Sequence, residues 1–188
     1  MGDSTSSSDA RSLRAQLEGL DRAQQHAVAY RWAKTNGKLI DLLGDYAKQR
    51  NLLIFQSGNE CENWIDPILN IVYKMNMLVH VGEDLARLFD RIDWFNQLFP
   101  STALRFIGFQ AMSSNNVYPV FVQPLIAHAR FATEKEIEDY MLSIGFSPTG
   151  KDGEFENKDF MVSDLKPKNV LFSPTGEILV IDAEVVKK

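Results

Sequence analysis

The stretch of residues 163–182 constrains the fold more than any other part of the sequence. It places Asp164, Asn169 and Asp182 at successive offsets of 5 and 13 residues, among short runs of strand-forming apolar residues. A turn that contains proline and glycine separates two of these runs within residues 170–181, which predicts a β-hairpin. That hairpin would return Asp182 to the neighbourhood of Asn169. Amide and carboxylate oxygens are ligands that magnesium prefers, so the segment predicts a hard-cation site.

The composition is that of a soluble globular protein. The 188 residues are 45% hydrophobic and 24% charged, which suits one domain or two small lobes. The net charge of −5 lacks the basic footprint of a nucleic-acid-binding surface, so no nucleic-acid partner is indicated. No apolar run approaches the roughly 20 residues of a membrane span, and the polar start is not a signal peptide. The single Cys61 fits a reducing compartment, so a cytoplasmic location is expected.

Helix and strand patterns follow one another in a definite order. Residues 1–8 are rich in Ser, Thr and Gly and are expected to be disordered, with a helix from Asp9 to about Ala33 and a second from Lys38 to Gln49. These two helices either form a partner-binding appendage or pack on the domain and complete its core, which is the favoured interpretation. The patterns that follow predict three strands, a helix and two strands, at residues 52–55, 63–65, 68–75, 83–98, 104–112 and 117–123. A capping box then opens a short helix at Thr133.

The sequence Asp-x-Lys-Pro-x-Asn at 164–169, with Asp182 at the correct distance, resembles the catalytic loop and metal-binding Asp of the protein-kinase-like superfamily. The chain is most similar to the compact kinase domain of bacterial and phage polyvalent proteins. In that family a short helix and a Gly-Phe turn lead to the catalytic loop, as residues 140–146 do here, and the similarity covers about residues 50–186. The resemblance implies an α+β fold: a minimal protein-kinase-like fold with a five-stranded antiparallel small lobe plus one helix, a truncated large lobe and an N-terminal helical pair. The expected divisions are a disordered tail at 1–8, N-terminal helices at 9–50, small lobe and hinge at 51–126, and the truncated large lobe with catalytic loop and metal-binding Asp at 127–188.

The resemblance also implies a reaction, phosphoryl transfer from ATP with magnesium. Asp164 would orient or deprotonate the acceptor hydroxyl, and Lys166 would neutralise charge on the transferred group. Asn169 and Asp182 would bind magnesium and thereby hold the nucleotide. The alternative, that Asp164 and Asn169 only cap a loop and Asp182 only ends a strand, accounts less well for the pattern as a whole. The partners implied are a nucleotide and an unidentified acceptor, either a small molecule or a protein.

Further contacts with ATP are expected upstream. Lys74, in an apolar run, resembles the strand lysine that holds the α- and β-phosphates, although an edge-strand lysine extending to water is an alternative. Gly58 is the single glycine of the expected phosphate-covering loop. Backbone groups near Gln123 and Leu125 would meet the adenine edge, but a plain buried strand predicts the same residues. The acidic partner of the lysine stays open among Glu83, Asp84 and Asp90.

Departures from the kinase pattern support a second hypothesis. Val162-Ser163 replaces the usual His-Arg, and Asp182-Ala183-Glu184 replaces Asp-Phe-Gly. The end at Lys188 is expected to leave no room for an activation loop or for peptide-binding helices. The glycine-poor phosphate-covering loop, the open acidic partner of Lys74 and the truncated large lobe motivate the alternative to an active phosphotransferase: a catalytically weak or inactive pseudokinase that acts as a nucleotide-binding or protein-interaction module. A third hypothesis is an interaction protein that acts through its first 50 residues.

Overall fold

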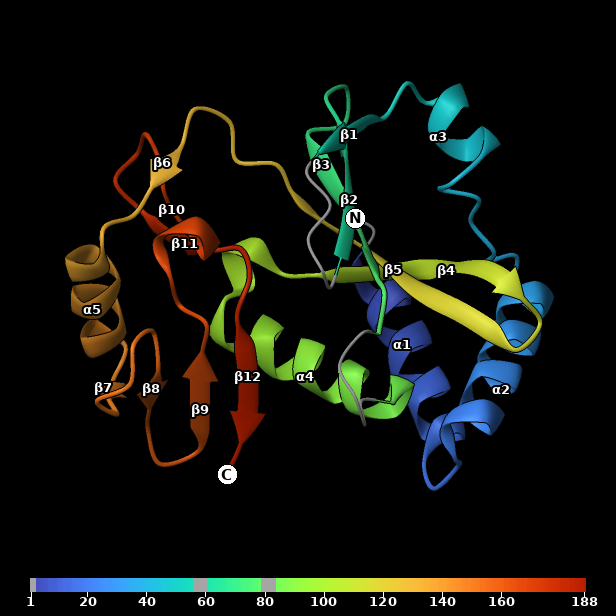
Figure 1. The fold of residues 1–188 in the computed structure, drawn as a ribbon, viewed down its shortest axis with the longest axis horizontal. Coiled ribbons are helices and arrows are strands. Elements are labelled where there is room, and N and C mark those ends of the chain that lie inside the picture. Colours follow the sequence, from blue (N-terminus) through green and yellow to red (C-terminus); the bar gives the residue numbers. More distant parts are fainter. Residues whose placement is uncertain (1–2, 56–60, 79–83) are drawn as a thin grey trace. The chain divides into compact units, whose positions relative to one another are not determined.

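The computed structural model describes residues 3–55, 61–78 and 84–188 (Figure 1). Helices and antiparallel sheets share the chain, so the predicted α+β class is confirmed. The chain forms two compact units, one of residues 1–90 with 104–125 and one of residues 91–103 with 126–188. Among the described residues, every helix is too short or too polar to span a membrane.

The first unit is built on an antiparallel sheet, which has five strands within the described part of the chain, in the order β1-β2-β3-β5-β4. The strands lie in or close to the runs that predicted them: β1 (Leu53–Phe55), β2 (Cys61–Asp66), β3 (Ile71–Asn76), β4 (Arg105–Ser113) and β5 (Asn116–Pro124).

Both faces of β5 are buried, with Val120 and Val122 on one face and Phe121 on the other. Phe121 joins an aromatic cluster with Phe106 of β4 and with Phe89 of α4 (Leu85–Leu98).

Three helices precede the sheet: α1 (Asp3–Leu17), α2 (Arg22–Thr35) and α3 (Asp45–Gln49). The single helix predicted from Asp9 to Ala33 is wrong, because Asp21 starts a new helix. Its side chain accepts a hydrogen bond of 2.8 Å from the Gln24 N–H, and the Gln24 side chain accepts one of 3.0 Å from the Asp21 N–H. This capping box satisfies N–H groups that a continuous helix would have bonded internally.

The beginning of α1 also differs from the sequence prediction. The helix begins at Asp3, ahead of the predicted start at Asp9 and within the segment 1–8 that was expected to form a disordered tail. Ser, Thr and Asp have low helix propensity, but they are favourable where a helix starts because their side chains bond its free N–H groups. A polar composition at a helix start is therefore easily interpreted as a tail.

Residues 38–40 join the sheet, so the helix predicted from Lys38 to Gln49 forms only at its end, as α3. The N–H of Phe109 in β4 donates to the Lys38 carbonyl and the Phe109 carbonyl accepts from the Ile40 N–H, both at 2.8 Å. A Cβ atom on Gly108 would lie 2.2 Å from the Lys38 carbonyl oxygen, so only glycine permits this approach. Leu13 and Leu17 of α1 are fully buried. The N-terminal helices are therefore part of the core of the first unit.

The second unit carries short strands around one helix. Its 3₁₀ turn η1 (Pro100–Thr102) contacts β11 through a hydrogen bond from the Thr102 hydroxyl to the Val180 carbonyl. The predicted capping box at Thr133 is confirmed, and it opens α5 (Glu134–Ser143). One sheet has the order β11-β10-β6 and the other β12-β9-β8-β7. The strands are β6 (Arg130–Phe131), β7 (Ser147–Pro148), β8 (Phe155–Glu156), β9 (Phe160–Ser163), β10 (Val170–Phe172), β11 (Ile178–Val180) and β12 (Glu184–Lys187).

Candidate active site

The predicted hairpin of residues 170–181 is confirmed, and it brings Asp182 back to Asn169. Strands β10 and β11 pair antiparallel, with Val170 opposite Val180. Beyond this pair, the carbonyl of Asn169 accepts hydrogen bonds from the N–H groups of Ile181, at 2.9 Å, and Asp182, at 3.3 Å. The backbone of Asp182 is thus held against that of Asn169.

Asn169 also binds the expected catalytic carboxylate. Its Nδ2 group donates to the backbone carbonyl of Asp164 and to the Asp164 Oδ2 atom, both at 2.8 Å. Both partners are acceptors, which requires the NH₂ end of the amide to face them. The Asn169 Oδ1 atom accepts no hydrogen bond from the described residues, so a metal ligand is available there. Asp164 has φ +58°, a left-handed conformation that Asp and Asn adopt more readily than most residues.

The loop between Asp164 and Asn169 is fixed by its neighbours. Leu165 is buried, and its N–H donates to the Gly153 carbonyl at 3.0 Å. Pro167 starts the 3₁₀ turn η2 (Pro167–Asn169), which the Asn169 N–H closes by donating to the Lys166 carbonyl at 2.8 Å. Proline suits this first position because its fixed φ is that of a helical turn and no N–H is required. The loop therefore holds its polar side chains on a defined backbone.

Lys166 lies beside Asp164, with 3.3 Å between its Nζ atom and the Asp164 Oδ1 atom. The two side chains keep 47% and 40% of their surface exposed. An ion pair this exposed is weak, so the ammonium group can exchange its partner for another anion at little cost. The two oxygens of Asp164 therefore have different neighbours, with an amide on Oδ2 and a mobile cation on Oδ1.

The donor set fits magnesium bound together with a nucleotide. Asp182 is exposed, and its carboxylate forms no hydrogen bond or ion pair with another described side chain. Within residues 3–55, 61–78 and 84–188, no group of three or more His, Cys, Asp or Glu side chains is arranged to hold a metal. Magnesium commonly takes one or two protein ligands and completes its octahedron with water and phosphate oxygens. Asn169 Oδ1 and the Asp182 carboxylate match that requirement.

A comparison with family models matches residues 22–187 to the family described as Serine/Threonine/Tyrosine Kinase found in polyvalent proteins. The chain belongs to this kinase family. At this level it is a kinase-like phosphotransferase, and the resemblance stated from the sequence is confirmed. The match begins at the first residue of α2, so α2 and α3 lie within the region that the family model covers. Neither a curated protein nor a solved structure is significantly similar to the chain.

In this member of the polyvalent-protein kinase family, Lys74 lies on β3, a strand that is paired with β2 on one side and β5 on the other. It is opposite Phe121 of β5, so both side chains lie on the sheet face that carries the aromatic cluster with α4. Because β3 is an inner strand, the alternative that Lys74 belongs to an edge strand is wrong. Asp90 does not bind Lys74, since Arg14 of α1 holds its carboxylate at 2.8 and 2.9 Å.

The other expected acidic partners and the phosphate-covering loop are only partly described. The Asp84 Oδ1 atom accepts a hydrogen bond of 2.7 Å from the Arg87 N–H and thereby caps α4. Glu83 and Gly58 lie outside the described residues.

The expected adenine-contacting segment consists of the end of β5 and the residue after it, and its hydrogen bonding could not be predicted from the sequence. Gln123 is buried, opposite Val72 of β3. Pro124 has no N–H, and the N–H of Leu125 donates to the Asn70 carbonyl at 2.9 Å. An adenine at this edge would therefore meet carbonyl groups of Pro124 and Leu125 and no N–H donor from either residue.

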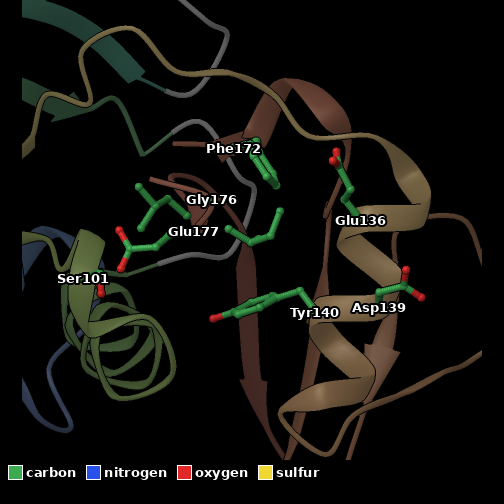
Figure 2. A pocket seen from close by; sticks show the side chains of 9 residues that line it. Ser101, Glu136, Asp139, Tyr140, Phe172, Gly176 and Glu177 are labelled. Atoms are coloured by element: carbon green, nitrogen blue, oxygen red, sulfur yellow. The ribbon is translucent and has the colours of Figure 1, made fainter. Parts of the chain in front are cut away.

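The second unit also contains a pocket of about 520 Å³ that sequence reasoning missed (Figure 2). It lies between α5, η1 and the β10–β11 hairpin, and it includes none of the expected catalytic residues. Arg130 binds Glu136 on its rim through two hydrogen bonds and lowers the pKa of that carboxyl to about 2. Burial raises the pKa of the Tyr140 hydroxyl. The pocket is lined by Ser101, Glu136, Asp139, Tyr140, Phe172, Gly176, Glu177, Ile178 and Leu179.

Proposed function

We propose that the protein is a magnesium- and ATP-dependent phosphotransferase whose catalytic groups are Asp164 and Lys166. The observation that carries the proposal is the double role of Asn169. Its side-chain NH₂ group donates two hydrogen bonds of 2.8 Å to Asp164, and its backbone carbonyl accepts a hydrogen bond from the N–H of Asp182. One buried residue therefore links the acceptor-side carboxylate to the backbone of the residue that carries the metal-side carboxylate. Family membership supports the reaction class.

The chain's residues would act mainly by positioning and by neutralising charge. Asp164 would accept a hydrogen bond from the acceptor hydroxyl and take its proton as the new P–O bond forms, while the bond between the γ-phosphorus and the β–γ bridging oxygen breaks and ADP leaves. Lys166 would leave the Asp164 Oδ1 atom and contact the transferred phosphoryl group. Asn169 Oδ1 and Asp182 would hold magnesium, which supplies neutralisation of the phosphate charge when bound. Lys74 would contact the α- and β-phosphates.

Two more upstream contacts complete the proposed nucleotide site. Gly58 would belong to the loop over the phosphates, and the carbonyl edge around Gln123 and Leu125 would meet the adenine. The acceptor would be a small molecule or a protein that bears a hydroxyl group.

A second candidate function is a pseudokinase that binds nucleotide or a protein partner without efficient transfer. The observation that favours it is the lack of N–H donors at Pro124 and Leu125, since an N–H from this segment would normally help to fix adenine. The engagement of Asp90 by Arg14 adds to it, because this carboxylate does not order Lys74. The pseudokinase would bind ATP weakly and would not turn it over.

Thermal unfolding with and without magnesium and ATP tests nucleotide binding. ATP at about 100 times its dissociation constant should stabilise the wild type by roughly 2.7 kcal/mol. Asp182→Asn should lose the part of this stabilisation that requires magnesium. Asp152→Asn, which changes another exposed aspartate of the second unit, should keep it. No stabilisation of the folded wild type at millimolar ATP would refute the proposal.

Transfer itself is tested by incubation with ATP labelled in the γ-phosphate and analysis of labelled products, including phosphate and the protein. The wild type should release or transfer label, and Asp164→Asn should reduce the rate while keeping nucleotide-dependent stabilisation. Binding of magnesium and ATP by the wild type without any turnover would favour the pseudokinase. Equal rates for Asp164→Asn and the wild type would show that Asp164 is not the catalytic carboxylate.

A further inference from the structure

Glu184 occupies a special place in the pairing of β9 with β12. It lies opposite Ser163, and this is the first pair of the ladder. Asp182 stands two residues before Glu184, and Asp164 stands one residue after Ser163. The Ser163–Glu184 pair is therefore the point at which the two segments that bear the proposed catalytic and metal-binding carboxylates are joined.

The Glu184 carboxylate is bound at both oxygens. Its Oε1 atom lies 3.3 Å from Nη2 of Arg91, and its Oε2 atom accepts a hydrogen bond of 3.5 Å from the Ser163 hydroxyl. Arg91 comes from the part of α4 that belongs to the second unit, and its side chain keeps 21% of its surface exposed, whereas that of Glu184 keeps 42%. Ion pairs that are shielded from water are screened less by salt than fully exposed ones.

A carboxylate so close to Asp182 requires an explanation. It could serve as a third metal ligand, or its charge could repel the phosphates of a nucleotide. The first role is not supported, because the two oxygens of Glu184 already face Arg91 and the Ser163 hydroxyl. The second effect is reduced, since the guanidinium of Arg91 neutralises the carboxylate. What remains for Glu184 is to tie its own backbone to β9 and α4.

We propose that Arg91 and Glu184 form a positioning pair that fixes the metal-binding orientation of Asp182. This inference rests on the proposed function. The Asp182 carboxylate forms no hydrogen bond or ion pair with a described side chain, so its direction depends on the backbone on either side. Asn169 holds that backbone on the N-terminal side, and Glu184 holds it on the C-terminal side. Release of Glu184 would let the segment 182–184 move and would weaken magnesium binding before it affects nucleotide binding.

The test measures ADP binding by calorimetry at a series of magnesium concentrations, using the full chain. Glu184→Gln and Arg91→Met should each weaken the apparent magnesium affinity by up to about 10-fold, the lower end of the effect of removing a group that orients a metal ligand, because the pair acts on Asp182 only through the backbone. ADP affinity without magnesium should not change. The double variant should be no worse than either single variant, because both remove one interaction. The exchange of Arg91→Glu with Glu184→Arg should recover part of the magnesium affinity.

The control is Glu156→Gln, which removes the ion pair of Glu156 with Lys188 in the same sheet and should leave magnesium affinity unchanged. Unfolding midpoints measured without ligand identify any variant that does not fold. In that case the magnesium affinity of Ser163→Ala is measured instead, because this variant removes only the hydroxyl contact with Glu184. Suppose that ADP binding by the wild type depends on magnesium, while folded Glu184→Gln and Arg91→Met keep the same magnesium affinity. This result would overturn the inference and leave the proposed function intact. A wild type that binds ADP without any magnesium dependence would overturn both.

Discussion

The contact between Gly153 and the catalytic loop makes a quantitative prediction for Gly153→Ala. Gly153 has φ +65°, and a Cβ atom placed on it would lie 3.1 Å from the Leu165 carbonyl oxygen and 3.2 Å from the Leu165 nitrogen. Two costs follow for the variant. The left-handed backbone costs a non-glycine residue roughly 1–2 kcal/mol. Displacement of the Leu165 backbone resembles overpacking and adds about 1–3 kcal/mol.

Gly150→Ala separates these two costs. Gly150 has φ +92°, but no atom lies within 4 Å of the position of its Cβ, so this variant has the backbone cost alone. In urea unfolding, Gly153→Ala should therefore lose about 2–5 kcal/mol and Gly150→Ala about 1–2 kcal/mol. Gly153→Ala should also bind magnesium and ATP more weakly, because Leu165 adjoins Asp164. Equal losses of stability in the two variants would show that Gly153 does not support the loop.

Two further predictions concern the first unit. Asp90→Asn should lower the free energy of unfolding by about 1 kcal/mol, because it weakens the bidentate, part-buried pair of Asp90 with Arg14 that joins α4 to α1. As a control, Lys135→Met, which removes an exposed pair on α5, should lower it by less than about 0.5 kcal/mol. Equal effects of the two changes in urea unfolding would show that α1 does not hold α4. His26 accepts a hydrogen bond of 3.2 Å from the Val117 N–H, and burial followed by the charge of Arg22 lowers its pKa below the usual 6.5. Below pH 6.5 the unfolded chain binds a proton that the folded chain does not, so stability should fall with decreasing pH, by at most about 1.4 kcal/mol per pH unit, until the lowered pKa is reached. His26→Asn keeps an acceptor but does not titrate, so the same fall between pH 7.5 and 5.5 in this variant would contradict the assignment.

Local patterns predicted the parts of the molecule that local chemistry decides. The hairpin of residues 170–181 follows from two apolar runs and a proline–glycine turn, and the start of α5 follows from the spacing of Thr133 and Glu136. The strands of the five-stranded sheet follow from apolar runs between polar turns. In each case the determining residues are close neighbours in the chain, so the signal is present in the sequence.

Where a neighbour distant in the chain competes with local propensity, the prediction fails. The helical pattern after Lys38 is overridden because two backbone hydrogen bonds to Phe109 add this segment to β4. Apolar periodicity does not record such contacts. The error at Asp21 is of another kind, because the capping box of Asp21 and Gln24 is a local signal that the apolar periodicity of residues 13–30 obscured.

The candidate site divides in the same way. The sequence alone determined the identity and spacing of Asp164, Asn169 and Asp182, because a motif on one loop and one hairpin is a local feature. Only the tertiary structure decided that the side-chain NH₂ group of Asn169 binds Asp164 and that the backbone carbonyl of Asn169 binds the N–H of Asp182. It likewise decided that the Leu125 N–H is already bonded and that Arg91 pairs with Glu184. The physical reason is that each residue offers several donors or acceptors of similar strength, from its side chain and from its backbone. Which of them form bonds depends on partners that only the folded chain brings within reach.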